Sequence, residues 1–336
     1  MDNNNYTLPV FAKGFSRARL ALKTTFTRVS RRSLAEETVS LGWDDRFVQV
    51  RPGCVRNSGT LADLGYKSAL LGGVRPERIT AIASLRRWLA DEAIMALRHE
   101  CTALESYSEE RDWIITKRTR GATRYSKFIN DMMNSRAFLL AVSRIAGVPL
   151  VPYPLVNARS QVNYYYPRHT PEQKQQVGMW HTDGTCFVLN MLMSDASEFQ
   201  GGEFLYHEGP VDTFHRETPQ RELVRKASLV SVGDSLFIHG SKLFHGVEPV
   251  VQGRRMSLVL SFHYPYSSED VNEFWHLASD DGIGQTLGKW MTLKRDLTRR
   301  ADEQYERLGI DPITFDDLLP KDLDASDEHH SYEGFP

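Results

Sequence analysis

Cysteine is scarce in this sequence of 336 residues, and neither sign of charge dominates it. The three cysteines, Cys54, Cys101 and Cys186, follow no metal-binding spacing, which excludes a disulfide-stapled secreted domain and favours a reducing compartment. With 41 basic and 43 acidic side chains the formal net charge is −2, so the overall charge gives no basis for binding nucleic acid.

Long hydrophobic runs and internal repeats are also absent. No apolar stretch approaches the roughly 18 residues that a membrane-spanning helix needs. Hydrophobic residues make up 41% and charged residues 25% of the chain, as in ordinary globular proteins. A chain of this length forms one large domain or two small ones. We therefore expect an intracellular protein, in the cytoplasm, without a membrane span.

Acidic residues are missing from the N-terminal arm, residues 1–35, after Asp2. Basic residues alternate there with phenylalanine, leucine, serine and threonine, a composition typical of a transit peptide for organellar import. A start of three asparagines does not fit that class, so a basic arm that packs on an acidic surface of the same protein is the main alternative. A patch for an acidic partner is a third. The basic residues are Lys13, Arg17, Arg19, Lys23, Arg28, Arg31 and Arg32.

The regions on either side of the middle of the chain have apolar residues at helical spacing. Residues 36–155 form a mixed region in which 78–106 and 126–145 are the expected helices, and both should pack on a core. Helical spacing returns over residues 267–320. The last residues, 321–336, form an acidic tail.

The middle region, residues 156–266, consists of short runs rich in Val, Leu, Phe and Tyr with glycine turns between them. Eight short strands suit a double-stranded β-helix, which is a jelly-roll fold. We therefore expect an α+β protein with a mainly β core, flanked by N- and C-terminal helices. A charged insertion at 207–227 is a candidate lid. The expected strands are 158–166, 178–183, 185–193, 203–207, 228–231, 235–239, 243–250 and 255–264.

A candidate metal site is formed by His181 and Asp183 together with His245. Residues i and i+2 of an extended strand point the same way, so His181 and Asp183 can reach one metal from one strand. His245 would then come from an opposing strand. Two histidines and one carboxylate hold non-haem Fe(II) with coordination positions left open, which makes these three residues the candidate ligands and catalytic residues.

The segment from His245 to Ser257 resembles the prolyl-4-hydroxylase-like branch of the 2-oxoglutarate/Fe(II) dioxygenases. A Pro-Val step and a glycine turn follow the histidine, and Arg255 lies ten places after it. The resemblance covers about 156–266. It implies that Arg255 and Ser257 bind the far carboxylate of 2-oxoglutarate, for which a guanidinium fork is well shaped. Arg254 takes the opposite strand face and is expected to be a solvated surface charge.

The same resemblance implies a reaction. Fe(II), 2-oxoglutarate and O₂ would be required, 2-oxoglutarate would yield succinate and CO₂, and ascorbate is a candidate reductant. Halogenating members of the superfamily replace the carboxylate ligand with a small residue, so Asp183 favours hydroxylation or a related C–H oxidation. The Gly201-Gly202-Glu203 turn also matches the family and is interpreted as architecture.

Further pocket residues are expected on the strand around Asn163. Asn163 and Tyr165 share one strand face and Tyr164 and Tyr166 the other, so one pair points inward. Asn-x-Tyr recurs at this place in the alkyl-demethylase branch, which favours Asn163 and Tyr165 as co-substrate residues, although tyrosines also simply pack in sheets. The candidate substrate-binding residues are Trp180, Thr185, Phe187 and His239.

Other functions compete with this interpretation. A zinc hydrolase also uses two histidines and a carboxylate but has no role for Arg255 and Ser257. A non-catalytic jelly-roll binding module would not retain the whole set. A nucleic-acid demethylase would carry a second arginine where this chain has Ser261. Among oxygenases, the helical flanks and the 207–227 insertion favour a small-molecule substrate, such as an amino acid or a secondary metabolite, over the peptide of a peptidyl-prolyl hydroxylase.

Overall fold

The computed structural model describes five main ranges of the chain, which together contain every residue of the candidate site. The N-terminal arm, the acidic tail and most of the expected C-terminal helices lie outside these ranges. In the described part, no helix is both long and apolar enough to cross a membrane. The described residues are 41–67, 74–110, 117–167, 178–215 and 221–265, with short pieces at 283–284, 287–288, 291, 306–311, 313–314 and 316–318.

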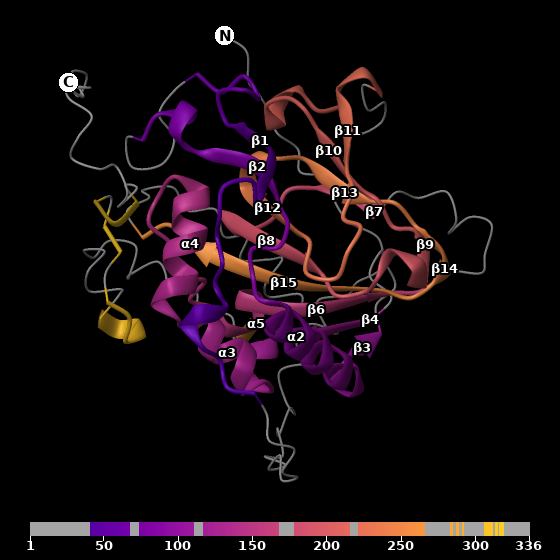
Figure 1. Cartoon of the computed structure of the whole chain (residues 1–336). Helices are drawn as coiled ribbons and strands as arrows, with labels where there is room; N and C mark the ends of the chain where they lie inside the picture. The colour runs from indigo at the N-terminus through magenta and orange to yellow at the C-terminus, as the bar shows by residue number, and fades with distance from the viewer. Residues whose placement is uncertain are drawn as a thin grey trace.

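Two antiparallel sheets form the core, and the chain alternates between them (Figure 1). This alternation is the jelly-roll arrangement of a double-stranded β-helix, so the predicted fold is confirmed. The larger sheet contains β6 (Ser160–Tyr165), β8 (Phe187–Leu192), β12 (Ser235–His239) and β15 (Arg255–His263). The smaller contains β7 (Gly178–His181), β10 (Phe204–His207), β11 (Val224–Ala227) and β13 (His245–Val247).

The N-terminal region lengthens the larger sheet at both edges. Strands β2 (Thr80–Leu85) and β1 (Val55–Thr60) follow β12, and β4 (Lys117–Arg120) and β3 (Glu109–Glu110) follow β6. The first half of the helix expected at 78–106 is therefore wrong, and the helix begins only at Asp91. Strand β2 is buried on both faces, so it lacks the alternation that identifies a strand. Two short strands complete the set: β5 (Val151–Pro152) pairs with β15, and β9 (Phe199–Gly201) pairs with β14 (Val250–Gly253).

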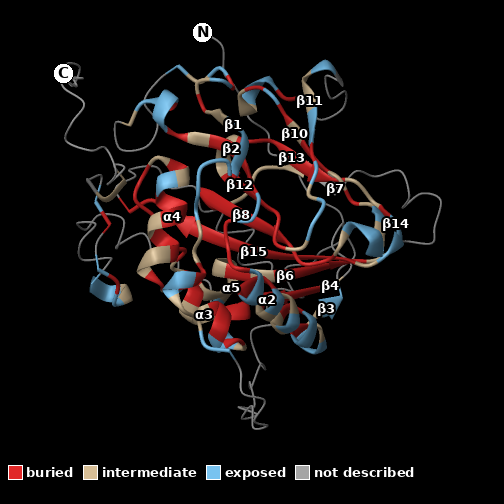
Figure 2. Ribbon diagram, viewed as in Figure 1, coloured by how far each residue is buried: buried red, intermediate tan, exposed pale blue. Residues whose placement is uncertain are grey.

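Helices cover one face of the larger sheet, which we call the outer face (Figures 1 and 2). They are α2 (Asp91–Ala103), α3 (Lys127–Met133), α4 (Arg136–Ala146) and the short α5 (Val156–Arg159). Phe138 of α4 packs on Phe262 of β15, with ring centroids 6.2 Å apart, and on Trp88, 5.6 Å away. The 3₁₀-helices are Asp45–Phe47, Pro76–Arg78, Leu104–Tyr107, Ala122–Arg124, Ala196–Glu198, Val211–Thr213, Arg221–Leu223, Gly240–Lys242 and Asp316–Leu318.

The single helix expected at 126–145 is divided into α3 and α4, and a serine caps the start of each. The hydroxyl of Ser126 accepts from the backbone N–H of Ile129, and that of Ser135 accepts from Phe138, both at 3.1 Å. Helix α4 ends at Gly147, whose φ of 79° places it in the left-handed region. A Cβ at this glycine would lie 1.8 Å from the carbonyl oxygen of Arg78, so no larger residue fits.

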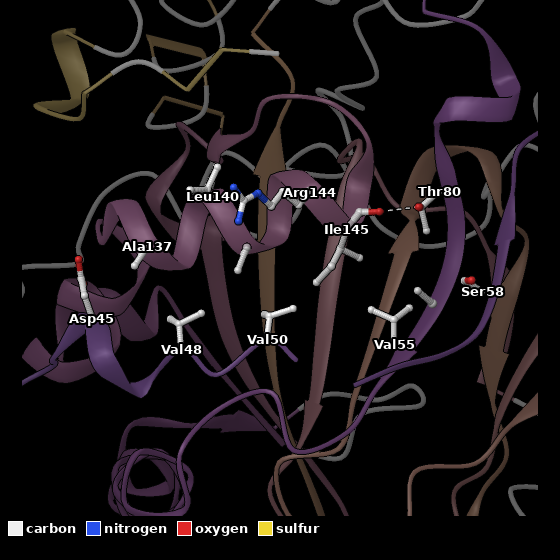
Figure 3. A pocket seen from close by; sticks show the side chains of 12 residues that line it. Asp45, Val48, Val50, Val55, Ser58, Thr80, Ala137, Leu140, Arg144 and Ile145 are labelled. Carbon is white, nitrogen blue, oxygen red and sulfur yellow. Dashed lines mark hydrogen bonds between the residues drawn. The ribbon is translucent and has the colours of Figure 1, made fainter. Parts of the chain in front are cut away.

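A mainly apolar cavity of about 500 Å³ lies between α4 and the chain leading into β1 (Figure 3). Valines Val48, Val50 and Val55 line one side, and Leu140 of α4 lines the other. None of the candidate site residues borders it.

The region expected as a strand at 228–231 is a turn, and the strand lies four residues earlier, as β11. The Asp234 carboxylate accepts from the backbone N–H groups of Val230 and Ser231 at 3.1 Å, which fixes the turn. The insertion expected at 207–227 thus ends in a strand of the smaller sheet.

Candidate metal and co-substrate site

His181, Asp183 and His245 converge at one end of the jelly roll. His181 on β7 is the cross-strand partner of His245 on β13, and their ring centroids are 4.4 Å apart. The two carboxylate oxygens of Asp183 lie 3.7 Å from Nε2 of His181 and 3.5 Å from Nε2 of His245. One donor atom from each residue lies within 4.8 Å of the other two. This donor set fits a single Fe(II) bound through two imidazoles and a carboxylate on one side.

The position of Asp183 depends on Gly240, which follows β12 directly. The backbone N–H of Asp183 donates to the carbonyl of Gly240 at 2.9 Å. A Cβ on Gly240 would lie 2.7 Å from a carboxylate oxygen of Asp183 and 2.8 Å from its Cβ. The close approach of the two segments therefore requires glycine at 240, a role that the sequence did not reveal.

His245 is held in the form that a metal requires. Its Nδ1 lies 2.9 Å from the carbonyl of Leu243 and donates to it, which leaves the lone pair of Nε2 directed to Asp183. The ring of Phe204 stacks on the imidazole at 5.3 Å. Burial lowers the pKa of His245 to about 4, against the opposing effect of Asp183, so the imidazole is neutral at neutral pH.

Arg255 and Ser257 lie on the other face of the larger sheet, which we call the inner face. On β15, Arg255 is opposite Tyr165 of β6, and Ser257 is opposite Asn163. The Arg255 guanidinium lies over the Tyr165 ring, 4.9 Å from its centroid, and the residue is 2% exposed. A Cβ on Gly202 would lie 2.8 Å from Cδ of Arg255, so the Gly-Gly turn also makes room for this side chain.

Buried polar atoms without partners gather on this inner face. Nη1 of Arg255, Oγ of Ser257 and Oδ1 of Asn163 have no hydrogen-bond partner. Each such group costs about 1–3 kcal/mol when nothing binds it, so their clustering points to a ligand. Oδ1 of Asn190 on β8 is a fourth, and sequence analysis missed it because β8 is otherwise apolar. A guanidinium, a hydroxyl and two amides suit a carboxylate-bearing co-substrate such as 2-oxoglutarate.

Tyr164 and Tyr166 point to the outer face, away from Arg255. The Tyr164 hydroxyl donates to the carbonyl of Cys101 at 2.7 Å, and the Tyr166 hydroxyl donates to Glu105. Arg254, expected as a solvated charge, is instead ion-paired with Glu105 at 2.8 Å and is one-third exposed. The face shared by Asn163 and Tyr165 is therefore the one that carries Arg255.

The structure does not bring Phe187 and His239 to the triad's side of the larger sheet. Phe187 is the cross-strand partner of Phe262 and stacks on Phe237 at 5.6 Å, on the helix-covered outer face. His239 is fully buried beside it, 4.5 Å from the Phe187 ring. Phe187 was expected to face the same way as Asp183 by strand alternation, but a bend at 184–186 separates Asp183 from β8 and the alternation does not continue.

The other two candidate substrate residues lie nearer the triad. Trp180 directly precedes His181 on β7 and packs on Phe214 at 5.0 Å. Thr185 is 7% exposed, and its hydroxyl oxygen is buried without a hydrogen-bond partner. Its carbonyl oxygen lies 2.9 Å from where a Cβ on Gly240 would be, and the nearest atom of Asp183 lies 2.7 Å from that point.

Comparison with known proteins identifies the region that carries this site. Residues 157–263 match the model of the 2OG-Fe(II) oxygenase superfamily. No curated protein matches the chain. Similar solved structures include a 2OG-Fe(II) oxygenase family oxidoreductase from Burkholderia pseudomallei, 15% identical, covering 57% of this chain and 88% of the other at a TM-score of 0.41.

Two further solved structures come from Streptomyces. HygX from Streptomyces hygroscopicus, with nickel, 2-oxoglutarate and hygromycin B bound, is 14% identical and covers 55% of this chain and 82% of its own, with a TM-score of 0.41. AviO1 from Streptomyces viridochromogenes is 16% identical and covers 57% and 94%, with a TM-score of 0.41. The stretch that matches the 2OG-Fe(II) oxygenase model, residues 157–263, holds the His-Asp-His triad and Arg255, in agreement with the predicted superfamily.

Proposed function

We propose that the protein is an Fe(II)- and 2-oxoglutarate-dependent dioxygenase that hydroxylates, or otherwise oxidises at C–H, a small organic molecule. The observation that carries the proposal is the presence of a His-Asp-His cluster together with a buried guanidinium and unpartnered polar atoms on the inner face of the larger sheet. A zinc hydrolase needs the first feature but has no use for the second.

Each residue has a role in this proposal. His181, Asp183 and His245 hold the metal on one side and leave its other positions open. Arg255, with Ser257, binds the far carboxylate of 2-oxoglutarate, and its 2% exposure strengthens this charge-assisted contact. Asn163 lies beside that carboxylate. When bound, Fe(II) with 2-oxoglutarate and O₂ supplies the oxidising chemistry, yielding succinate and CO₂, and ascorbate serves as the reductant of the iron.

The ten-residue spacing from His245 to Arg255 supports placement in the prolyl-4-hydroxylase-like branch. Asp183 supports hydroxylation over halogenation, because a carboxylate occupies the position that a halide would need. The helical flanks and the 207–227 insertion support a small molecule over a peptide, which is the alternative substrate.

The direct test is anaerobic loading of the full chain with Fe(II), followed by O₂ uptake and succinate release in the presence of 2-oxoglutarate. Arg255→Gln should raise the Kd of 2-oxoglutarate at least about 30-fold, since loss of a buried charged partner costs about 2 kcal/mol or more. Arg254→Gln is the matched control, because this neighbouring arginine lies on the outer face and pairs with Glu105.

Iron-loaded protein that neither binds nor consumes 2-oxoglutarate would contradict the proposal. So would equal effects of the Arg255 and Arg254 substitutions on the Kd of 2-oxoglutarate. Turnover of an ester or amide with Zn²⁺ and without 2-oxoglutarate would favour the hydrolase instead.

A further inference from the structure

A cavity of about 1390 Å³ lies between the β1–β2 edge of the larger sheet and the β10–β11 edge of the smaller one. Its lining comes from the chain around β1, the end of β2, the first turn of α2 and the segment from β11 to β12. Ligand sites in proteins span roughly 300–1,000 Å³, so the space accommodates a small molecule together with water.

Positive charge is in excess around this cavity. Five basic and three acidic side chains line it. The carboxylate of Asp234 accepts hydrogen bonds from two backbone N–H groups and lies 3.6 Å from the guanidinium of Arg86. Lys226 forms an ion pair with Glu248 at 2.9 Å. Asp91 and Glu92 begin α2, where their charges complement the helix dipole. Three guanidinium groups form no ion pair within the described residues: those of Arg51, Arg56 and Arg87.

The backbone is strained at this cavity. Among the described residues, two that are not glycine have positive φ: Asn57 at 45° and Arg87 at 50°. Both border the cavity. Asparagine tolerates this region, but for arginine it costs on the order of 1–2 kcal/mol. Strained backbone of this kind clusters at ligand sites, and Arg87 borders the cavity.

Part of the cavity lining is apolar, and one lining residue neighbours a residue of the triad, although no triad residue itself lines the cavity. Ile82, Leu89 and Ile94 line it, and all three are buried. Tyr206 of β10 also lines it, and this residue is the cross-strand partner of His245. Cross-strand partners share a sheet face with their Cβ atoms about 4.5–5.5 Å apart. Tyr206 therefore borders the cavity and neighbours a metal ligand.

We propose that this cavity binds the substrate and that the substrate is an organic anion. Arg51, Arg56 and Arg87 hold its oxyanion, a carboxylate or a phosphate, because guanidinium groups bind both in a bidentate manner. The apolar lining holds the hydrocarbon part and directs it past Tyr206 to the metal. This inference rests on the proposed function, since it assigns the class of substrate that the triad oxidises.

The test compares three probes of equal chain length, octanoate, octyl phosphate and 1-octanol, by calorimetric titration of the full chain. One of the two anions should bind at least about tenfold tighter than the alcohol, as expected for a charge-assisted contact, and its identity names the oxyanion. The double variant Arg51→Gln/Arg87→Asn should abolish this preference, since asparagine removes the charge but tolerates the positive φ. Arg46→Gln, an exposed arginine paired with Asp44, should retain it.

Equal binding of all three probes, or an anion preference that survives in the folded double variant, would overturn the inference. A second measurement places the probe relative to the triad. With Mn²⁺ bound in place of Fe(II), the methyl protons of the bound anion should relax faster than those next to its head group. The reverse order would contradict the orientation and with it the inference.

The two proposals fail separately. An arginine-dependent anion preference in a protein that binds neither Mn²⁺ nor 2-oxoglutarate would contradict the proposed function and leave the anion site standing. Normal 2-oxoglutarate turnover with no anion preference would contradict the further inference alone.

Discussion

At the scale of single residues, the triad depends on Gly240 as well as on its three ligands, because glycine has only a hydrogen atom where other residues have a Cβ. Gly240 lets the segment after β12 approach Asp183, and a methyl group there would lie 2.7 Å from the carboxylate. Gly240→Ala should therefore displace Asp183 and weaken Mn²⁺ or Fe(II) binding at least about tenfold, the usual effect of disturbing a group that orients a metal ligand. Metal titration of the anaerobic protein measures this.

The matched control for that substitution is Gly59→Ala. A Cβ on Gly59 would meet its nearest neighbour at an ordinary 3.8 Å. Metal affinity should be unchanged in this variant. Equal affinity in the Gly240 and Gly59 variants would show that the carboxylate does not need the space.

The sequence predicted the residues of the triad but not the residues that support them. Sequence motifs were sufficient to predict His181, Asp183 and Arg255, because spacing along one strand fixes which side chains share a face. They were not sufficient to predict Gly240 and Asn190, because the roles of these two residues arise from contacts between strands distant in the chain. Phe187 failed for a local reason, since the bend at 184–186 shifts the alternation of β8.

At the scale of elements, the sequence predicted β strands best where a short apolar run lies between glycine turns, as for β12, which begins and ends at the predicted residues 235 and 239. Strand β15 follows the expected alternation of Arg255 and Ser257 against Met256 and Leu258. Strand β2 has apolar or small residues on both faces and was mistaken for helix. Strand β2 pairs with β12 and with β1, and no local sequence pattern specifies these two pairings.

The division between α3 and α4 yields a prediction of its own. Ser135 caps α4 through Phe138 and donates to Asp45 at 2.6 Å, so it joins two elements. Ser135→Ala should lower the free energy of unfolding by about 1–2 kcal/mol, the usual cost of losing a cap. Urea denaturation monitored by circular dichroism measures the change.

An exposed serine provides the control for the cap. Ser58→Ala on β1 should stay within about 0.5 kcal/mol of the parent protein, as surface substitutions do. If the Ser135 variant were as stable as the Ser58 variant, α3 and α4 would be divided by the surrounding packing and not by the cap.

At the scale of the whole molecule, buried histidines couple stability to pH. Burial lowers the pKa of His239 to about 3 and that of His263 to about 4, below the ordinary 6.5. Below pH 6.5 the unfolded chain therefore binds protons that the folded chain does not bind, so the free energy of unfolding falls as the pH falls. Each histidine should cost on the order of 1–3 kcal/mol by pH 4, and neither effect should appear above pH 7.

A substitution at His263 separates this effect from the loss of metal binding in acid. His263 packs on Tyr153 and lies at the opposite end of β15 from Arg255. His263→Gln should flatten the dependence of unfolding free energy on pH between 7 and 5, measured by urea denaturation of the metal-free protein. His99→Gln, exposed on α2, should leave that slope unchanged. An unaltered slope in the His263 variant would mean that this imidazole already carries its proton in the folded chain, so that something other than its neutral burial governs the acid limit of the fold.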